Sequence, residues 1–343
     1  MRKQIYIILT FLFVGSLSWL YIQKDLITPT TRSDNQKDEL RSQSHSEEVD
    51  SKSNIVTERL TASPESPHPD STTSTAHLQS FYVAVSIANV YKDPNSESET
   101  VTQALHGEPV RILTWDESWA KVSLPDQFDY QGWIQVSAIK IIPPGKMWTN
   151  HKIVSVKNSE VRTLPNQDSE LLTVLPIGTV VTSDVSEVND RFTAIQMVDG
   201  VRGYIWSEDL LDYSSRDPAD VSGDRILDTA RQFLDLPYLW GGMTTEGVDC
   251  SGFVHTVFKV NGIRLHRDAD LQYLYDGIRV NIDELKPGDL VFFETYTYGA
   301  SHVGIYVGDG KFIHSSSKLG VSYASLDTSY FAERFLGSKR ILD

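Results

Sequence analysis

The chain has 343 residues, of which 40% are hydrophobic, and a formal net charge of -15 at pH 7. This length exceeds that of most single domains, and the composition suffices for three small hydrophobic cores. The acidic charge argues against a nucleic-acid ligand, because binding to phosphates normally requires a basic face. The single cysteine, Cys250, excludes an internal disulfide, so the folded parts depend on core packing.

Residues 1–23 have the pattern of an export segment. Arg2 and Lys3 precede a mostly apolar stretch over residues 5–22. The small residues Ser16 and Ser18, which flank Leu17, would suit a cleavage site, but the apolar stretch continues past them and approaches the ~20 residues that span a bilayer. We therefore expect an uncleaved membrane anchor more than a cleaved signal, and a protein that lies outside the cytoplasm.

Residues 24–77 are rich in Ser, Thr, Asp, Glu, Lys and Gln and contain almost no aromatic residues. Such a segment buries too little apolar surface to offset the entropy lost on ordering. The composition predicts a disordered polar linker between the anchor and the folded part. Its simplest function is that of a spacer.

Two stretches, residues 78–145 and 150–213, repeat one pattern in nearly constant register. The landmarks of the first are Asn89 to Asn95, Ser98-Glu99, Gly107 and Gly132-Trp133-Ile134; those of the second are Glu160 to Asn166, Ser169-Glu170, Gly178 and Gly203-Tyr204-Ile205. Short β-rich runs separated by turn residues lie between them, which predicts two small all-β barrels. Their Pro-containing starts and their closing Gly-aromatic-Ile triplets resemble bacterial SH3 domains. That resemblance implies a role in binding wall peptide or in shaping a neighbouring active-site cleft.

Cys250 lies at the start of a predicted helix that ends at Asn261-Gly262. Apolar residues recur at helical spacing after it: Phe253, Val254, Val257 and Phe258. Asp249 is the expected N-cap, so the thiol belongs to the first turn, where the helix dipole favours the thiolate. Many lone cysteines are only buried apolar residues. This position instead predicts a lowered pKa and a nucleophile.

A nucleophilic thiol needs a neighbouring base, and the C-terminal third offers four histidines: His255, His266, His302 and His314. His255 is turned roughly 140° from Cys250 on the same helix at about 3.6 residues per turn, so we expect it to be a surface or packing residue. His266 lies in a predicted loop. The two remaining histidines lie on two predicted strands that flank Gly308-Asp309-Gly310.

The length of the loop between these strands decides whether His302 and His314 share a face of the sheet. A two-residue turn at Asp309-Gly310 would place them on opposite faces. A three-residue loop over residues 308–310 would pair His314 with Gly304, within diagonal reach of His302. We predict the three-residue loop.

Residues 222–343 contain a series of motifs in a characteristic order and at compatible spacing: Tyr238-Leu239-Trp240-Gly241-Gly242, Asp249-Cys250-Ser251-Gly252-Phe253, Leu285 to Phe293, His302-Val303-Gly304-Ile305-Tyr306 and Phe312-Ile313-His314. They resemble the NlpC/P60 family. The resemblance implies an α+β fold with a compact papain-like catalytic domain behind two all-β SH3-like barrels. It also implies cleavage of bacterial cell-wall peptides, typically between D-glutamate, through its γ-carboxyl, and the diamino acid.

The resemblance assigns roles to individual residues. Cys250 would be the nucleophile, His302 the base that takes its proton, and His314 the group that orients His302. The backbone N–H of Cys250 is an expected oxyanion donor. Tyr238 would place a hydroxyl near the nucleophile, although it could equally be an aromatic packed beside Trp240. Two residues that flank the nucleophile would contact substrate: Asp249 and Ser251.

Two such barrels before the catalytic domain resemble the subgroup that acts on peptides with a free N-terminal L-alanine. There the first SH3 domain supplies a tyrosine, matched by Tyr130, and an acidic residue that reads the amine. Glu99 and Glu108 both lie near the expected place; Glu108 is taken as the candidate, although spacing does not decide. Asp268, in a loop that resembles an Arg-Asp-Ser/Ala motif, would help to hold the amine, unless Arg267-Asp268 is only a surface ion pair. Ala269 follows in place of the serine and removes one expected hydrogen bond.

The sequence therefore predicts a thiol peptidase that hydrolyses the γ-D-glutamyl to diamino-acid bond, and no cofactor. A zinc site is disfavoured because the chain has no close Cys-x-x-Cys or His-x-x-x-His pair. The expected partners are peptidoglycan peptides or muropeptides, and a monomer is expected on the extracellular or cell-wall side. Two alternatives remain open: a wall-binding SH3 adaptor with a degenerate catalytic domain, and an amidase or acyltransferase on the same scaffold.

Overall fold

The computed structural model describes residues 80–143, 147–188, 191–213 and 220–342. The predicted anchor over residues 5–22 and the predicted linker over residues 24–77 lie outside the described residues. Within the described ranges, no helix is both long and apolar enough to cross a membrane.

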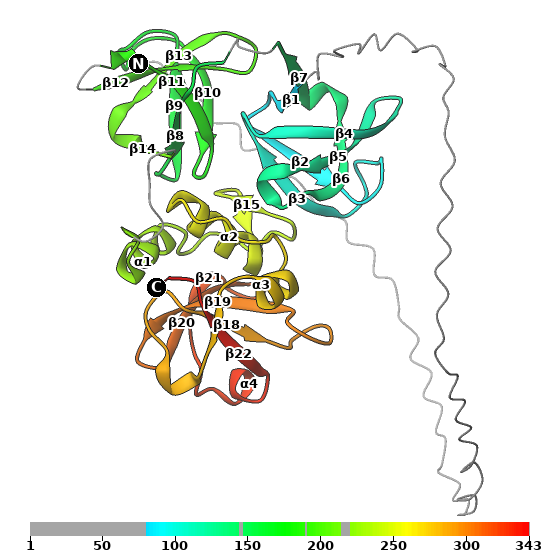
Figure 1. Ribbon diagram of the computed structural model, residues 1–343, viewed down its shortest axis with the longest axis vertical. Coiled ribbons are helices and arrows are strands. Elements are labelled where there is room, and N and C mark those ends of the chain that lie inside the picture. Colours follow the sequence, from blue (N-terminus) through cyan, green and yellow to red (C-terminus); the bar gives the residue numbers. More distant parts are fainter. Residues whose placement is uncertain (1–79, 144–146, 189–190, 214–219, 343) are drawn as a thin grey trace, which may run out of the picture. The chain divides into compact units, whose positions relative to one another are not determined.

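The first repeat forms a seven-stranded sheet in the order β3-β2-β6-β5-β4-β1-β7, in which the paired strands run antiparallel (Figure 1). Its strands are β1 (Ser80–Val83), β2 (Ile87–Tyr91), β3 (Thr100–Leu105), β4 (Pro109–Asp116), β5 (Trp119–Leu124), β6 (Tyr130–Gln135) and β7 (Ile139–Ile142). Two short 3-10 turns interrupt it, Pro125–Gln127 and Val136–Ala138. The buried aliphatic side chains of these strands form a core of their own, which includes Val90, Val122 and Ile134.

The second repeat has the same strand order, β10-β9-β13-β12-β11-β8-β14. Its strands are β8 (Asn150–Val154), β9 (Asn158–Arg162), β10 (Leu171–Pro176), β11 (Val180–Val188), β12 (Phe192–Gln196), β13 (Arg202–Trp206) and β14 (Leu210–Asp212), with a 3-10 turn at Ser207–Asp209. Each strand corresponds to the one seven places earlier in the chain. The repeat in the sequence thus corresponds to a repeat in topology, and both sheets have the SH3-like strand arrangement.

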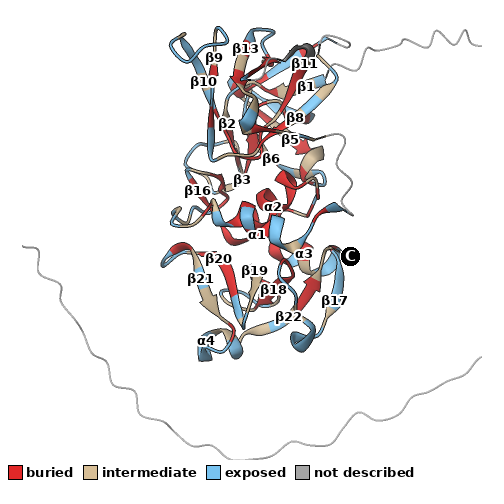
Figure 2. Ribbon diagram, turned by 90° about the vertical axis from the view of Figure 1, so that its left-hand side faces the viewer, coloured by how far each residue is buried: buried red, intermediate tan, exposed pale blue. Residues whose placement is uncertain are grey.

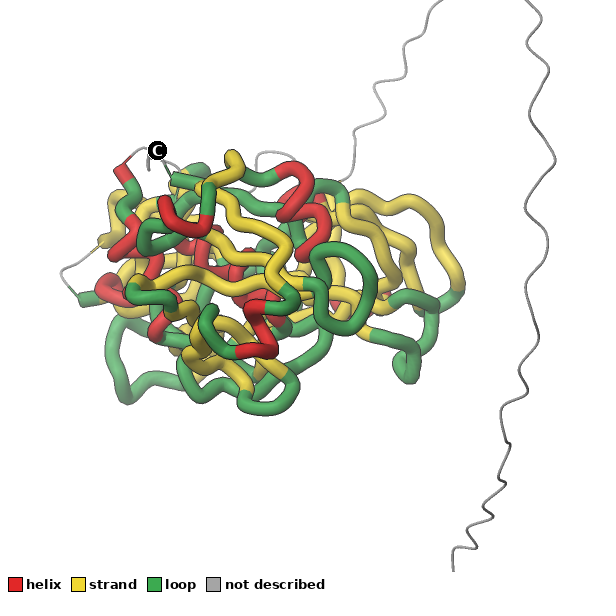
Figure 3. The backbone as a smooth tube through the Cα atoms, turned by 90° about the horizontal axis from the view of Figure 1, so that it is seen from below, coloured by secondary structure: helices red, strands yellow, loops and turns green. Residues whose placement is uncertain are grey.

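The C-terminal domain combines helices with a six-stranded sheet in the order β17-β22-β18-β19-β20-β21. Its strands are β17 (Ile278–Val280), β18 (Leu290–Phe293), β19 (His302–Gly308), β20 (Lys311–Ser316), β21 (Gly320–Ser325) and β22 (Phe335–Arg340), and a small ribbon joins β15 (Met243–Thr244) to β16 (Gly247–Val248). Its helices are α1 (Gly223–Arg231), α2 (Cys250–Val260), α3 (Ala269–Tyr275) and α4 (Ser329–Ala332), with a 3-10 turn at Ile282–Glu284. Figure 3 shows how short these helices are beside the strands and loops. The α+β class predicted for this domain is confirmed.

Helix α2 lies between the six-stranded sheet and the SH3-like domains, and all eleven of its residues are buried (Figure 2). The predicted N-cap is confirmed, because the Asp249 carboxylate accepts a hydrogen bond of 2.6 Å from the Gly252 N–H. The helix ends at Asn261, and Gly262 follows with a positive φ of 81°. Phe253 and Phe258 belong to its apolar contacts with the sheet and with α1. The nucleophile candidate is therefore mounted on the most enclosed helix of the domain.

The hairpin of β19 and β20 has the predicted register, since Ile305 pairs with Ile313 and Tyr306 with Phe312, which places His314 opposite Gly304. The turn itself differs from the prediction. Asp309 and Gly310 form a two-residue turn with positive φ angles of 50° and 68°, as a type I′ turn requires. A bulge before Gly308 absorbs the extra residue and restores the register that brings the histidines to one face.

Candidate active site

The thiol of Cys250 lies in the first turn of α2 and is 5% exposed. Burial raises the pKa of Cys250 to about 12, and the neighbouring Asp249 carboxylate acts in the same direction. Contacts with the backbone of Val303 and Ser251 oppose this shift without cancelling it. The predicted lowered pKa is therefore wrong for the free enzyme, because desolvation of the thiolate outweighs the helix N-terminus.

The His302 and His314 rings meet through one hydrogen bond, with Nε2 of His302 2.7 Å from Nδ1 of His314. Burial lowers the pKa of His302 to about 3, with the neighbouring His314 adding to the shift, and it lowers the pKa of His314 to about 4. Both rings are therefore neutral near pH 7. Because Nε2 of His302 is engaged, Nδ1 is the nitrogen left to accept a proton. Phe331 and Phe312 pack against the His314 ring and keep water away from the pair.

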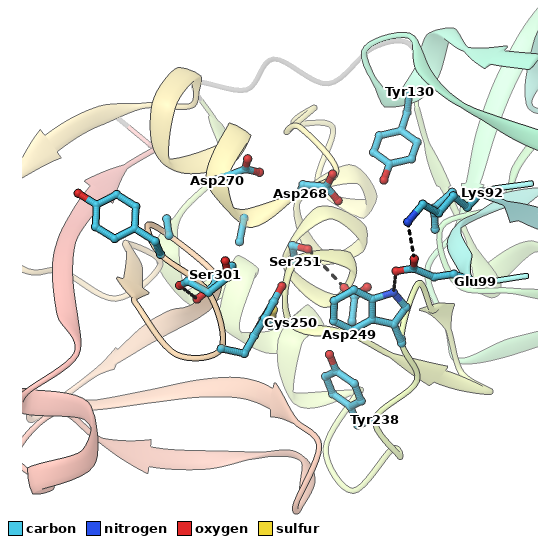
Figure 4. Close-up of a pocket in the computed structure, with 17 residues that line it drawn as sticks. Lys92, Glu99, Tyr130, Tyr238, Asp249, Cys250, Ser251, Asp268, Asp270 and Ser301 are labelled. Atoms are coloured by element: carbon cyan, nitrogen blue, oxygen red, sulfur yellow. Dashed lines mark hydrogen bonds and ion pairs between the residues drawn. The ribbon is translucent and has the colours of Figure 1, made fainter. Parts of the chain in front are cut away.

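A cavity of about 410 Å³ opens at Cys250 between the catalytic domain and the first SH3 domain (Figure 4). Six of the residues that the sequence singled out line it: Tyr130, Tyr238, Asp249, Cys250, Ser251 and Asp268. His302 directly follows one of its lining residues, Ser301. Other residues of its wall have no substrate role predicted from the sequence: Lys92, Trp240, Asp270, Tyr296 and Tyr298.

Glu108 is absent from this cavity, so its predicted contact with the substrate amine is wrong. Its side chain is 1% exposed and forms an ion pair with Lys259 at the far end of α2. The alternative candidate, Glu99, does line the cavity. Its carboxylate accepts a hydrogen bond of 2.8 Å from the indole Nε1 of Trp240 and lies 3.5 Å from Nζ of Lys92. Packing between the domains, which spacing in the sequence does not show, separates the two glutamates.

Tyr130 and Asp268 lie together at the wall of the cavity, one from each domain (Figure 4). Burial and the Asp268 carboxylate both raise the pKa of Tyr130. Burial likewise raises the pKa of Asp268, while Arg267 and the Tyr130 hydroxyl that hydrogen-bonds to it act in the opposite direction. Asp268 is the N-cap residue of α3 but makes no side-chain cap. Its carboxylate is therefore available to the cavity.

Arg267 is not a surface residue, because only 1% of its side chain is exposed. Its Nη2 donates to Oδ2 of Asp249 at 2.7 Å, and its Nη1 donates to Oγ of Ser251 at 3.0 Å. Burial opposes the charge of the guanidinium, but the Asp249 carboxylate outweighs it and raises the pKa of Arg267. Asp249 and Ser251 thus line the cavity with polar atoms that are already engaged. The interpretation of Arg267-Asp268 as a loop ion pair at the surface is wrong.

Gly241, in the motif Trp240-Gly241-Gly242, allows the two domains to approach. A Cβ at this position would lie 2.3 Å from the carbonyl oxygen of Thr100 in β3, and its φ of +74° favours glycine. Next to it, the Met243 N–H donates to Oε1 of Gln103 at 2.9 Å. This contact holds the first SH3 domain beside the segment that leads to Cys250.

The structure offers a second, larger cavity of about 680 Å³ between the two SH3 domains. Its wall includes Tyr82, Asp126, Trp148, His151 and Tyr213. It lacks the thiol, since Cys250 is the chain's single cysteine and lies in the other cavity. Among the described residues, no group of three or more His, Cys, Asp or Glu side chains is arranged to hold a metal ion. The candidate chemistry is therefore that of the thiol and the two imidazoles.

Comparison with known proteins identifies the class. The NlpC/P60 family model matches residues 235–340, and a model described as a bacterial dipeptidyl-peptidase SH3 domain matches residues 90–139. The chain belongs to the NlpC/P60 family, and it is a cysteine peptidase with an SH3-like region before its catalytic domain.

Among its relatives, the chain is 34% identical over 227 residues to a gamma-D-glutamyl-L-lysine dipeptidyl-peptidase of Bacillus subtilis, covering 62% of this chain and 71% of that protein. A protein of the same name from Bacillus cereus is 30% identical over 260 residues, covering 70% and 75% of the two chains. The crystal structure of an NlpC/P60 family protein from Bacillus cereus superposes with a TM-score of 0.66 at 24% identity, covering 77% of this chain and all of that one. That likeness shows the fold.

Proposed function

We propose that the protein hydrolyses the γ-D-glutamyl to diamino-acid bond of peptidoglycan peptides whose N-terminal L-alanine is free. The proposal rests on the cavity wall that the first SH3 domain contributes, which lies opposite the residues of the catalytic domain. There the first SH3 domain places Glu99 and Tyr130 in the same cavity as Cys250 and Asp268. Two relatives are named gamma-D-glutamyl-L-lysine dipeptidyl-peptidases, which supports the same bond.

The charge of the cavity suits a cationic group at the end of a short peptide. Its wall contains four carboxylates, Glu99, Asp249, Asp268 and Asp270, against the single ammonium group of Lys92. Arg267 neutralises Asp249, and Lys92 lies near Glu99. Asp268 accepts a hydrogen bond from Tyr130 and lies 4.0 Å from Nη1 of Arg267, and its remaining lone pairs can bind an α-ammonium group together with Glu99 and the Tyr130 hydroxyl.

The catalytic step begins from neutral partners. The raised pKa of Cys250 and the lowered pKa of His302 mean that the proton leaves the thiol as the sulfur attacks, not beforehand. His302 takes the proton on Nδ1 while sulfur bonds to the γ-carbonyl carbon of the D-glutamyl residue. The backbone N–H at the start of α2 is the expected donor to the resulting oxyanion. His314 holds the His302 ring through the 2.7 Å bond.

Collapse of the tetrahedral intermediate breaks the carbon–nitrogen bond, and the His302 imidazolium protonates the departing amine of the diamino acid. This leaves a thioester between Cys250 and the L-Ala-γ-D-Glu dipeptide. Water then attacks the thioester carbon, giving one proton to His302. The carbon–sulfur bond breaks, the dipeptide leaves with its γ-carboxylate, and the thiol recovers its proton.

Glu99 and Tyr130 form the part of the cavity wall that the first SH3 domain supplies. An acyl group on the alanine nitrogen would remove the positive charge and add bulk at this wall. We therefore propose released peptides as substrates in preference to stem peptides still joined to glycan. Two other tyrosines of the wall, Tyr296 and Tyr298, are 63% and 95% exposed.

The proposed location is the extracellular or cell-wall side, supported by the apolar stretch over residues 5–22. Residues 1–79 lie outside the described part of the chain, and the anchor stays a prediction. The monomeric state likewise stays a prediction. The intact set of Cys250, His302 and His314 speaks against the alternative of an adaptor with a degenerate catalytic domain.

The direct test is digestion of L-Ala-γ-D-Glu-L-Lys, of its diaminopimelate counterpart and of both N-acetylated peptides by residues 78–343. Release of L-Ala-γ-D-Glu from the free-amine peptides, absent in Cys250→Ala, is the expected result. Equal cleavage of free and acetylated peptides would retain the peptidase and refute the amine-reading role. Cleavage of none of them would contradict the proposed substrate.

A further inference from the structure

Six buried polar side chains form a continuous chain of contacts that leaves helix α2 at its N-terminus, crosses the first SH3 domain and returns to the last turn of α2. We call this chain the polar brace. Its members, in order of contact, are Asp249, Arg267, Thr102, Gln127, Glu108 and Lys259. None of the six is more than 8% exposed.

The first half of the polar brace starts at the N-cap of the nucleophile helix. Both guanidinium Nη atoms of Arg267 bond to the Asp249 carboxylate, at 2.7 and 3.1 Å. The Nε of Arg267 donates to Oγ1 of Thr102 in β3 at 2.9 Å, and Thr102 in turn donates to Oε1 of Gln127 at 2.8 Å. The N-cap carboxylate is thus tied to a strand of another domain through two side chains.

The second half returns to the opposite end of the same helix. The Nε2 of Gln127 donates to the Gln103 carbonyl at 2.8 Å and reaches Oε2 of Glu108 at 3.5 Å. Glu108 then forms an ion pair and hydrogen bond with Nζ of Lys259, in the last turn of α2. Gln127 therefore connects the two ion pairs.

The buried charges of the polar brace make it sensitive to displacement. The polar brace contains two carboxylates and two cations, each paired within it, so no charge is buried alone. Burial opposes the charge of Lys259, but Glu108, Asp126 and Tyr213 together outweigh it and raise its pKa. Removing one partner of a buried pair leaves an uncompensated charge, so these contacts tolerate little displacement of the domain against the helix.

We infer that the polar brace positions Cys250, so that the first SH3 domain supports the nucleophile itself as well as bounding the substrate cavity. Thr102, Gln127 and Glu108 are positioning residues that act through Arg267 and Lys259 on the two ends of α2. The segment that carries Glu99 and Thr102 continues to Glu108. Displacement of this segment therefore moves the amine-reading wall and the helix together. The part of the inference that concerns substrate rests on the proposed function.

Within the described residues the second SH3 copy has no polar brace, and its side chains can be compared with those of the first copy at equivalent positions. Gly107 recurs as Gly178 and Gly132 as Gly203, a constant offset of 71 residues. Thr102 is matched by Thr173, but at the positions equivalent to Glu108 and Gln127 the second copy has other side chains, Thr179 and Val198. The Thr179 hydroxyl bonds within its own turn, to the Pro176 carbonyl at 2.7 Å. The fold itself therefore does not require the charged and amide members of the polar brace.

Gln127→Leu is the most informative variant, because it breaks the polar brace in the middle and leaves both ion pairs intact. Cys250 is the chain's single thiol, so the rate of its alkylation by iodoacetamide reports on its environment without a substrate. We expect that rate to rise, and kcat for the free-amine peptide to fall, each by about three- to tenfold, the value of one or two lost hydrogen bonds. The pH at which alkylation becomes half-maximal is also expected to fall, because a less buried thiol ionises more readily.

Two controls separate positioning from general destabilisation. Gln135→Leu makes the same change at an exposed position of the same domain and is expected to leave both rates unchanged. Val122→Ala removes core volume from the first SH3 domain away from the polar brace, so it is expected to lower the unfolding temperature without raising the alkylation rate. If Gln127→Leu does not fold, Thr102→Val with Thr173→Val as its matched control applies the same test.

Alkylation rates and kcat within twofold of the parent protein in folded Gln127→Leu and Thr102→Val would overturn the inference. An increase in alkylation that Val122→Ala reproduces would overturn it as well. Should the parent protein cleave no peptide, the proposed function fails, while the alkylation comparison still decides the polar brace. The two failures are therefore distinguishable.

Discussion

The two SH3 copies have the same strand order but contribute different sets of side chains to the catalytic domain. The first copy supplies polar groups: Glu99, Thr102, Gln103, Glu108 and Tyr130. The second supplies Ile153 and Ile177 to the hydrophobic core of the catalytic domain, besides a polar contact in which the Thr245 hydroxyl donates to Oδ1 of Asn158 at 2.8 Å. One copy thus helps to build the active site, and the other extends the core.

Equivalent positions show how this division arises. His106 corresponds to Ile177, Tyr130 to Val201 and Gln103 to Val174. The fold survives these exchanges because the positions that need small residues are kept. Gly132 and Gly203 each allow a neighbouring strand to approach: a Cβ there would lie 2.5 Å from Val90 Cγ1 in the first copy and 2.3 Å from Val161 Cγ1 in the second.

The largest effect is expected when the thiol is removed. The remaining activity is the baseline against which variants of either SH3 copy are compared. Cys250→Ala is expected to reduce peptide hydrolysis by more than about 10³-fold, because no other thiol exists to attack the carbonyl. Steady-state release of dipeptide, measured with circular dichroism to verify the fold, checks this. Residual hydrolysis within tenfold of the parent enzyme would contradict a thiol mechanism.

Ile177→Ala and His106→Ala test the same position in the two copies. Ile177→Ala removes volume from the catalytic core and is expected to lower the free energy of unfolding by about 2–5 kcal/mol. His106→Ala removes the acceptor of the Val198 N–H, a bond of 3.2 Å, and is expected to cost about 1–3 kcal/mol. Urea titration measures both losses in the free energy of unfolding. A larger loss in His106→Ala than in Ile177→Ala would contradict the assignment of Ile177, in the second copy, to the catalytic core.

Acid is expected to destabilise the catalytic domain through its histidine pair. Burial lowers the pKa of His302 to about 3 and of His314 to about 4 in the folded state, below their ordinary 6.5. Their contribution to stability is therefore fully present above about pH 6.5 and lost as the pH falls toward these values, because the unfolded chain binds the protons first. A smaller loss between pH 6.5 and 4 is expected in His302→Phe, and an unchanged profile would contradict the argument.

Tyr130→Phe is expected to give the smallest effect on the active site. It removes the hydroxyl that bonds to Asp268 but keeps the ring, so KM for the free-amine peptide should rise by about three- to tenfold. The same substitution in the second copy is Tyr204→Phe, at the position equivalent to Trp133. Tyr204 lies away from the cavity, and its substitution is expected to leave KM unchanged. Equal effects of the two substitutions would remove the distinction between the copies.

Local patterns predicted the elements that carry the catalytic residues. The N-cap at Asp249, the helix from Cys250 and the register that joins His302 to His314 are confirmed, because short-range periodicity and turn chemistry determine them. The roles of the site residues stay predictions. Two predictions were wrong because they depend on tertiary packing. Glu108 is buried against Lys259 and does not reach the cavity, and desolvation raises the pKa of Cys250. No spacing in the sequence predicts which of two nearby glutamates another domain will cover.

The most direct measurement of the central claim compares Glu99→Gln with Glu170→Gln, the equivalent exposed residue of the second copy. The value to determine is kcat/KM for L-Ala-γ-D-Glu-L-Lys, with the N-acetylated peptide as the reference. Glu99→Gln is expected to lower kcat/KM for the free-amine peptide about ten- to hundredfold, the value of a charged hydrogen bond, while Glu170→Gln leaves it unchanged. Equal values for both variants would contradict the claim that the first SH3 domain is part of the active site.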